Sequence, residues 1–216
     1  MAFILSEKNT IANQYLAELR DVTIQQDRMR FRRNMERLGE IMAYEISKTF
    51  TYEKKDVETP MGIANMQLPK ERIVLATILR AGLPFHQGFL NYFDNADNAF
   101  ISAYRKHHKG GTFEIKIEYI SCPNLDDAVL ILVDPMLATG ASMHMALQKL
   151  LENGTPKEIH VATAIASTSG FNYLKRLNAK ASIWMGAMDD ELTARSFIVP
   201  GLGDAGDLSY GGKLQE

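Results

Sequence analysis

The sequence has a single cysteine, Cys122, among 216 residues. An intramolecular disulfide needs two cysteines, so we expect a protein of a reducing compartment, and we predict a cytoplasmic location. No apolar run approaches the roughly 18 residues of a membrane-spanning helix. The first residues, MAFILSEKNT, lack the basic leader and long apolar stretch of a signal peptide, so we expect none.

The sequence also lacks an excess of charge of either sign, with a formal net charge of −2 at pH 7. A globally basic surface for nucleic acid or anionic membranes is therefore excluded. Five of the 24 lysine and arginine residues lie close together, at Arg28, Arg30, Arg32, Arg33 and Arg37. Acidic residues dilute this stretch, so a solvated or subunit-facing helix is favoured over an RNA contact.

Hydrophobic residues make up 46% of the chain, which is ample for a packed core. Apolar runs predict buried strands, and segments with helical spacing of apolar residues alternate with them. The predicted strands are 72–79, 99–105, 114–121, 128–133, 158–167 and 182–187, and the predicted helices are 9–48, 84–92, 142–154 and 169–177. This alternation predicts an α/β fold with a mostly parallel sheet flanked by helices.

We treat residues 1–216 as a single domain with several appended features. Residues 1–50 form a helical arm, and a hairpin follows at 55–70 around Pro60 and Gly62. A second hairpin is predicted to carry a mobile, polar tip at 106–112. The glycine-rich tail, 196–216, is expected to form an ordered loop.

The stretch ILVDPMLATGAS, residues 131–142, combines a buried strand, an acid and a loop of small residues before a predicted helix. Ligands of open parallel sheets bind beyond the carboxyl ends of the strands, where Asp134 lies. The free N–H groups of a helix N-terminus favour an anion, and Thr139 and Ser142 add hydroxyl donors. A carboxylate can accept two hydrogen bonds from sugar hydroxyls, so this stretch favours a sugar phosphate.

The alternative is an ordinary turn between a strand and a helix, with Ser142 as the helix N-cap. That interpretation accounts for Ser142 and passably for Gly140. It leaves the acid, the second hydroxyl and the other small residues without a reason. Phosphate binding is therefore favoured, although the stretch taken alone leaves both interpretations open.

Three stretches of the chain resemble one family. VLILVDPMLATGAS (129–142) resembles the 5-phosphoribosyl-1-pyrophosphate (PRPP) signature of type I phosphoribosyltransferases, in the single-acid variant of uracil phosphoribosyltransferases. ILRAGL (78–83) resembles the pyrophosphate loop of that family, and IVPGLGDAGD (198–207) resembles its uracil-binding segment. The helix-like stretch 28–45 is similar to the N-terminal helix of the family. The tail segment is the specific one and indicates uracil.

The resemblance implies roles for residues of this sequence. Asp134, Arg80 and Asp204 would carry the catalytic roles. The residues matched to PRPP contacts are Arg80, Arg105, Asp134, Pro135, Met136, Leu137, Ala138, Thr139, Gly140, Ala141, Ser142 and Asp204. Those matched to uracil contacts are Ile198, Gly203, Asp204 and Ala205. Mg²⁺ would be bound together with PRPP, with no metal site belonging to the protein alone.

The implied reaction joins uracil and PRPP to give uridine monophosphate (UMP) and pyrophosphate. No histidine stands out as a general base, so positioning and stabilisation of the leaving group are expected to supply most of the rate. The 106–112 flap would close over the site and exclude water. The family also implies a homodimer or higher homo-oligomer, with helix 27–48 as our candidate interface. GTP binding and allosteric activation occur in some members.

Two departures from the family pattern affect the site. Ala141 stands where a second glycine is usual, and a positive φ there would strain the loop by roughly 1 kcal/mol or more. Phe197 stands where tyrosine is common, which removes a hydroxyl from the edge of the base pocket. Neither departure removes a group that is assigned to the chemistry.

Three other patterns suggest sites that we do not favour. Gly201, Gly203 and Gly206 spell the G-x-G-x-x-G dinucleotide fingerprint, which needs a following helix and an acid about 20 residues on. Residues 207–212 are not expected to be helical, so a dehydrogenase is rejected. The adjacent His107 and His108 would point apart and are interpreted as surface residues. The acidic run 189–191 is interpreted as a solvated turn.

Two alternative functions remain open. One is a phosphoribosyltransferase for another base, which the tail segment disfavours. The other is a regulator that senses nucleotides on the same fold and binds RNA through the arginine-rich helix. We expect a catalytically inactive regulator to have lost Asp134 or Arg80, and both are present.

Overall fold

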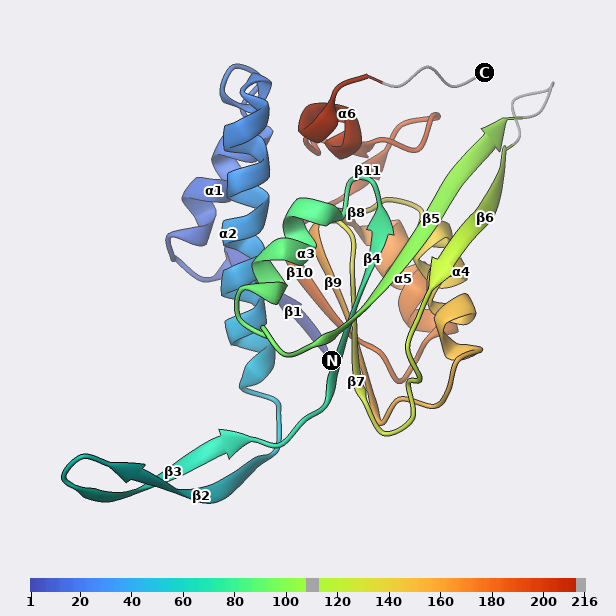
Figure 1. The fold of residues 1–216 in the computed structure, drawn as a ribbon. Coiled ribbons are helices and arrows are strands. Elements are labelled where there is room, and N and C mark those ends of the chain that lie inside the picture. Colours follow the sequence, from blue (N-terminus) through green and yellow to red (C-terminus); the bar gives the residue numbers. More distant parts are fainter. Residues whose placement is uncertain (108–112, 213–216) are drawn as a thin grey trace.

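A computed structural model describes residues 1–107 and 113–212, with the side chains of 103–107 and 113–116 left outside the description (Figure 1). Its centre is a sheet with the strand order β1-β10-β9-β7-β4-β5-β6. These strands are β1 (Ala2–Ile4), β4 (Ile73–Leu79), β5 (Asp97–His107), β6 (Phe113–Ser121), β7 (Val129–Val133), β9 (Glu158–Ser167) and β10 (Ser182–Asp189). All neighbours on this path are parallel except β5 and β6. The predicted mostly parallel sheet is confirmed.

The central strand β7 shows why the apolar runs form this sheet. All five of its residues are buried. Val129, Ile131 and Val133 contribute to one hydrophobic cluster, whereas Leu130 and Leu132 contribute to another. Successive side chains of a strand point to opposite faces, so a strand covered on both faces must be apolar throughout.

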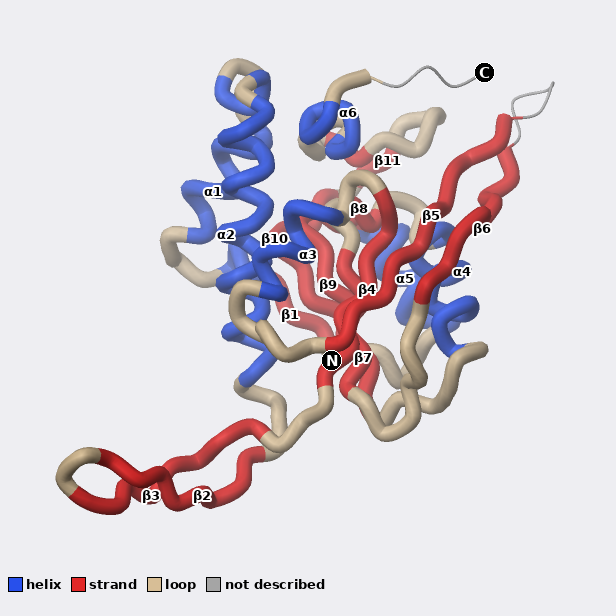
Figure 2. The backbone as a smooth tube through the Cα atoms, viewed as in Figure 1, coloured by secondary structure: helices blue, strands red, loops and turns tan. Residues whose placement is uncertain are grey.

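Helices cover both faces of the sheet (Figures 1 and 2). On one face lie α1 (Ala12–Arg20), α2 (Arg28–Ser47) and α3 (Leu83–Leu90), and on the other lie α4 (Ala141–Leu151) and α5 (Thr168–Leu177). The predicted 9–48 helix is two helices, because residues 21–27, which contain the short turn η2 (Ile24–Gln26), interrupt it. Asp27 then caps α2 by accepting a hydrogen bond from the Arg30 backbone N–H at 3.0 Å.

A two-stranded hairpin of β2 (Tyr52–Thr59) and β3 (Gly62–Pro69) extends away from the rest of the molecule (Figure 1). Its turn lies at Pro60 and Met61, as predicted, and all eight residues of β2 are exposed. The other predicted hairpin is formed by β5 and β6, but residues 108–112 of its predicted mobile tip lie outside the described residues.

The tail contains more regular structure than the sequence suggested. After β11 (Glu191–Leu192) and β12 (Ile198–Val199) it forms a short helix, α6 (Ala205–Tyr210). The prediction that residues 207–212 are not helical is therefore wrong. The dinucleotide interpretation still fails, because Gly201, Gly203 and Gly206 follow a two-residue strand that pairs only with β11, outside the main sheet.

Two short elements complete the description: the turn η1 (Leu5–Glu7) and the strand β8 (Met136–Leu137), which pairs with β9. Within residues 1–107 and 113–212, no helix has the length and hydrophobicity that crossing a membrane requires.

Candidate functional site

The candidate site lies where β4 and β7 end side by side. Thr77 of β4 pairs with Val133 of β7, so Arg80 and Asp134 follow neighbouring positions at the carboxyl edge of the sheet. The tail reaches the same edge. The Cα of Gly206 faces Ala81, because a Cβ built on Gly206 would lie 3.8 Å from the Ala81 Cβ. The stretches 78–83, 134–142 and 198–207, distant in sequence, thus meet at one edge of the sheet.

Asp134 is held at the end of β7 by its backbone N–H, which donates to the Ala162 carbonyl at 3.1 Å. Burial raises the pKa of its carboxyl to about 8. A carboxyl in this environment keeps its proton near neutral pH unless a bound group supplies hydrogen-bond donors or positive charge. A ligand with such groups would favour the ionised form of Asp134.

The loop after Asp134 is attached to the neighbouring strand before it reaches the helix. Met136 and Leu137 form β8, and the Pro135 carbonyl accepts a hydrogen bond from the Ile165 N–H at 3.0 Å. The Pro135 and Leu137 side chains are buried. This attachment fixes the first half of the loop and leaves residues 138–142 as its turn into α4.

Gly140 makes the turn into α4. Its φ is 82°, and a Cβ there would lie 2.9 Å from the Gly170 carbonyl oxygen, so only glycine fits without strain. Gly140 is also the N-cap position, so the interpretation of Ser142 as N-cap is wrong. Ala141 is the first residue of α4 and has no positive φ, which removes the reason for expecting strain there.

The first turn of α4 presents the groups that an anion needs. The N–H groups at the start of a helix have no partner within it and carry the positive end of the helix dipole. Ser142 lies in this first turn, and Thr139 precedes it with its hydroxyl 3.4 Å from the Ala141 nitrogen. The Thr139 hydroxyl and the first N–H groups of α4 therefore lie side by side.

Ser167, the last residue of β9, was not among the predicted site residues, yet its side chain holds this loop in place. Its hydroxyl donates to the Ala138 carbonyl at 2.5 Å and accepts from the Gly170 N–H at 2.9 Å. It thereby caps α5 and holds the loop with the same side chain. Only the position of Ser167 directly before a predicted helix could have signalled the capping role.

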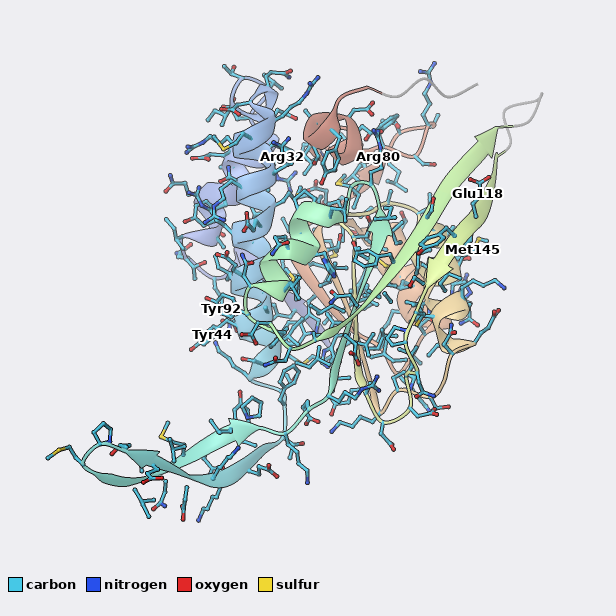
Figure 3. The ribbon with its side chains drawn as sticks, viewed as in Figure 1. Arg32, Tyr44, Arg80, Tyr92, Glu118 and Met145 are labelled. Carbon is cyan, nitrogen blue, oxygen red and sulfur yellow. The ribbon has the colours of Figure 1, made fainter. Side chains whose placement is uncertain are left out.

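Arg80 follows β4, and the Leu79–Arg80 peptide bond is cis. Its guanidinium lies beside α6 (Figure 3), with Nη2 3.6 Å from Asp207 Oδ1. The side chain is 44% exposed, so it can move to meet an anion. Arg105 lies in β5, but its side chain is outside the described residues, as are those of His107 and His108.

Asp204 lies in the tail, directly before α6. Its Oδ1 accepts hydrogen bonds from the Gly206 and Asp207 N–H groups at 2.9 and 3.0 Å, which caps α6. The residue is exposed, so its second carboxylate oxygen faces outward. Gly203 before it is exposed with a φ of 97°, whereas Ile198 and Ala205 are buried. The loop thus offers backbone groups next to an apolar wall.

The interpretation of residues 189–191 as a solvated turn is wrong for Asp189. This residue ends β10, is 8% exposed, and pairs with Arg20 through two contacts of 2.8 Å. Asp190 and Glu191 are exposed, as expected. The sequence could not reveal the pair, because the two residues lie 169 positions apart.

A cavity of about 500 Å³ lies between α2, α3, β5 and α6. Arg32, His86, Asn98, Phe100 and Tyr210 are among its lining residues, and none of the predicted site residues lines it. Burial lowers the pKa of His86. In the part of the chain that the structure describes, no three His, Cys, Asp or Glu side chains gather as a metal site.

The chain is similar in sequence to known proteins of one family. The family model for uracil phosphoribosyltransferase matches residues 6–212. A uracil phosphoribosyltransferase from Porphyromonas gingivalis is 54% identical over 97% of this chain and 98% of its own length. One from Methanothermobacter thermautotrophicus is 38% identical over 94% and 93%.

Solved structures extend the comparison to the fold. A protein from Aquifex aeolicus superposes with a TM-score of 0.88 at 30% identity, covering 100% of both chains. The orotate phosphoribosyltransferase of Mycobacterium tuberculosis, solved in complex with PRPP, gives a TM-score of 0.52 at 11% identity, over 86% of this chain and 94% of that one. The second likeness concerns the fold alone.

Proposed function

The chain belongs to the uracil phosphoribosyltransferase family, and from this premise we propose that it transfers the 5-phosphoribosyl group of PRPP to N1 of uracil, giving UMP and pyrophosphate. We take the whole chain as one catalytic domain. The observation that carries the proposal is the meeting of the 78–83, 134–142 and 198–207 stretches at one edge of the sheet. These are the stretches that resemble the pyrophosphate, PRPP and uracil segments of the family.

In the PRPP half of the proposed site, the Asp134 carboxyl group receives the ribose hydroxyls. Two hydroxyl donors compensate the loss of solvation that raises its pKa. The 5′-phosphate lies at the N-terminus of α4, against the backbone of 138–142 and the hydroxyls of Thr139 and Ser142. Pro135, Met136 and Leu137 contribute through the attachment of the loop to β9.

In the base half, the backbone of the tail pairs with the edge of uracil. Uracil alternates carbonyl acceptors and N–H donors, and a tightly turned backbone at Gly203 and Ala205 can offer the complementary groups. Ile198, 5% exposed, supplies the apolar wall. Phe197 is 48% exposed at the rim, so a missing tyrosine hydroxyl there leaves this wall intact.

Arg80, Arg105 and Asp204 serve the leaving pyrophosphate. Guanidinium groups suit such an anion, and Arg80 is exposed enough to reach it. Mg²⁺ fits this donor set as an ion carried by PRPP, because Mg²⁺ usually binds one or two carboxylates together with substrate phosphates. Asp204, with its outward oxygen, is the residue that would hold it. When bound, the ion neutralises charge that develops on the pyrophosphate.

The chemistry then depends on placement. The N1 atom of uracil displaces pyrophosphate at the ribose C1, through a transition state with oxocarbenium character. The two loops bring N1 and C1 together, which converts a bimolecular encounter into an oriented one. Arg80 stabilises the charge on the departing group. Closure of the 106–112 segment over the site, which would exclude water, remains part of the proposal.

Self-association is also part of the proposal. A two-stranded ribbon is at best marginally stable alone in water, yet the β2–β3 hairpin extends from the molecule with Met61 96% and Ile63 71% exposed. A second copy would cover it. The apolar residues of α2, such as Met35 and Leu38, already pack inside the chain, so the hairpin is a stronger interface candidate than helix 27–48. GTP activation remains a prediction from the resemblance.

A cytoplasmic location also remains a proposal. It is supported by Cys122, which is free and is the single cysteine of the chain.

The test is UMP formation from PRPP and uracil with Mg²⁺, beside parallel reactions with adenine, guanine, hypoxanthine and orotate. We expect turnover with uracil and none, or far less, with the other bases. Turnover of a different base would overturn the assignment of the tail loop. PRPP binding without turnover of any base would instead support the regulatory alternative.

A further inference from the structure

A buried ion pair holds the base loop by its backbone. Arg20 is the last residue of α1, and its Nη1 and Nη2 donate to the two carboxylate oxygens of Asp189 at 2.8 Å each. Arg20 Nη1 also donates to the Gly201 carbonyl at 2.9 Å, and Asp189 Oδ2 accepts from the Gly201 N–H at 2.9 Å. Both backbone groups of Gly201 are therefore held by one Arg–Asp pair.

These hydrogen bonds hold the loop at a tight bend. Gly201 has a φ of 57°, and a Cβ there would lie 2.2 Å from the Ile198 carbonyl oxygen. The bend lies between Ile198 on one side and Gly203 on the other, which are the proposed wall and backbone contact for uracil. A shift of Gly201 would move both, because the loop folds back on itself at this position.

The neighbouring strand end holds the other loop in the same manner. Asp189 of β10 is in register with Ser167 of β9, and Ser167 holds the Ala138 carbonyl. Two adjacent strand ends thus each position one loop: Ser167 the proposed phosphate loop, and Asp189 the proposed base loop. The two attachments share no side chain, so each can be broken separately.

We propose that Arg20 and Asp189 are positioning residues for the base: they preorganise the uracil-binding backbone without touching the substrate. The inference rests on the proposed function and deepens it. The pair is shielded from water, with side chains 24% and 7% exposed, so its hydrogen bonds do not face the competition that weakens surface pairs. Loss of the hydrogen bonds to Gly201 would displace the backbone groups that recognise uracil and leave the PRPP loop in place.

The experiment compares Michaelis constants for both substrates in Arg20→Gln and Asp189→Asn. Because small misplacements of a reacting group can cost up to about 100-fold, we expect the KM for uracil to rise about tenfold or more. The KM for PRPP should stay within about twofold. Ser167→Ala should show the reverse split, with the KM for PRPP raised and that for uracil little changed.

The control is another Arg–Asp pair of this chain. Arg72 donates through Nε and Nη2 to Asp97 Oδ2, at side chains that are 45% and 49% exposed. Arg72→Gln should change neither KM, because this pair contacts none of the proposed site residues. Equal rises in both KM values for the Arg20 and Asp189 variants, or unchanged values, would overturn the proposal.

Amide hydrogen exchange does not depend on activity. It distinguishes the positioning role of Arg20 and Asp189 from the proposal that uracil is the base. Amide hydrogen exchange at Gly201 should accelerate in Arg20→Gln and Asp189→Asn relative to the wild type and Arg72→Gln, since both variants weaken the hold on this backbone. Arg20→Lys, which keeps the charge but loses the paired geometry, covers the case in which a larger change prevents folding. Unchanged exchange refutes the positioning role even if the wild type converts uracil. If the variants exchange faster but the wild type turns over another base, only the choice of uracil is refuted, and the KM split is then measured with that base.

Discussion

Asp134 is the proposed contact for the ribose hydroxyls, and its surroundings determine whether its carboxyl group is protonated. Its carboxyl group follows a fully buried strand, and burial raises its pKa to about 8. In the free protein at neutral pH the group holds its proton, and it ionises when a ligand offers hydroxyl donors or positive charge. The ionised form of Asp134 is unfavourable in the empty protein, and the hydroxyl groups of a ribose would stabilise it.

The first prediction concerns the stability of Asp134→Asn. The folded protein keeps the Asp134 proton up to about pH 8, whereas an unfolded aspartate releases it near pH 4. The stability that this group contributes is present below about pH 4 and is lost as pH rises towards 8. Relative to the wild type, Asp134→Asn should therefore gain stability across this window, by up to about 1.4 kcal/mol per pH unit, while losing activity.

Urea unfolding at several values between pH 5 and pH 8 measures this difference. Asp190→Asn, at an exposed aspartate, is the control and should run parallel to the wild type. A constant offset between Asp134→Asn and the wild type at all pH values would contradict the raised pKa.

The second prediction concerns the glycine that turns the loop. Gly140→Ala forces a Cβ onto a residue with a φ of 82°, 2.9 Å from the Gly170 carbonyl oxygen. We expect a loss of about 1–2 kcal/mol in stability and a higher KM for PRPP, with the KM for uracil unchanged. Thermal unfolding and initial rates measure both.

Ala141→Gly is the matched control for Gly140→Ala. Ala141 begins α4 without a positive φ, so glycine there should cost at most about 1 kcal/mol and should not improve PRPP binding. A clear gain in PRPP affinity would show that the usual glycine of the family matters at this position after all.

At the residue scale, the sequence motif predicted the residues proposed to bind the substrate but not the residues that hold the binding loops in place. Asp134 and Gly140 could be identified because a local pattern of acid, small residues and helix start has a local purpose. Asp189 could not, since its partner is 169 residues away and its burial depends on how the tail folds over β10. Supports of this kind become visible only when the fold brings distant segments together.

At the scale of elements, α6 is the clearest difference between expectation and structure. Its sequence AGDLSY contains poor helix formers, and it spans only 6 residues. Contacts at both ends hold it instead: Asp204 caps its start, and Arg32 of α2 donates to the Ser209 carbonyl at 2.7 Å (Figure 3). Local propensity could not predict a helix that tertiary contacts stabilise, whereas the long apolar strands were predicted because their burial is evident from composition.

The third prediction separates the two parts played by Asp204. Asparagine caps a helix about as well as aspartate, so Asp204→Asn should keep α6 and lose only the negative charge. Asp204→Ala should lose the cap as well, which costs about 1 kcal/mol. We expect the stability of Asp204→Asn to equal that of the wild type and to exceed that of Asp204→Ala, with activity reduced in both.

Chemical denaturation and UMP assays over a range of Mg²⁺ concentrations measure these effects. If the charge helps to hold the ion, Asp204→Asn should need more Mg²⁺ for half-maximal rate. An Asp204→Asn variant with full activity at every Mg²⁺ concentration would restrict this residue to the capping role.

At the scale of the whole molecule, strand order decides where the site lies. Because β4 and β7 are neighbours, two loops separated by about 50 residues of chain open at the same edge of the sheet, and the tail then closes over them. The sequence predicted the parallel class of the sheet and most of its strands, but not β1, which lies in the stretch 1–50 that was interpreted as a helical arm. The order of the strands and the route of the tail were not contained in any local pattern, since they depend on which faces pack together.

The last prediction concerns the projecting hairpin. Pairing of Val57 with Ala64 and of Lys55 with Met66 places Val57, Ala64 and Met66 on one face together with Lys55, because residues opposite each other share a face and alternate residues follow it. The opposite face carries Asp56, Asn65 and Gln67, with Ile63 opposite Glu58 near the turn. If a second copy covers the Met66 face, Met66→Lys should weaken the dimer, since it would replace an apolar contact with a second positive charge beside Lys55.

Sedimentation equilibrium over a range of protein concentrations tests this, with Gln67→Lys as the control on the opposite face of the same hairpin. We expect Met66→Lys to shift the protein towards monomer and Gln67→Lys to leave association unchanged. Since the hairpin contributes no residue to the proposed site, UMP formation per chain should fall in Met66→Lys only if the active form is the dimer. A monomeric wild type, or a dimer that is indifferent to both substitutions, would assign the contact to another surface.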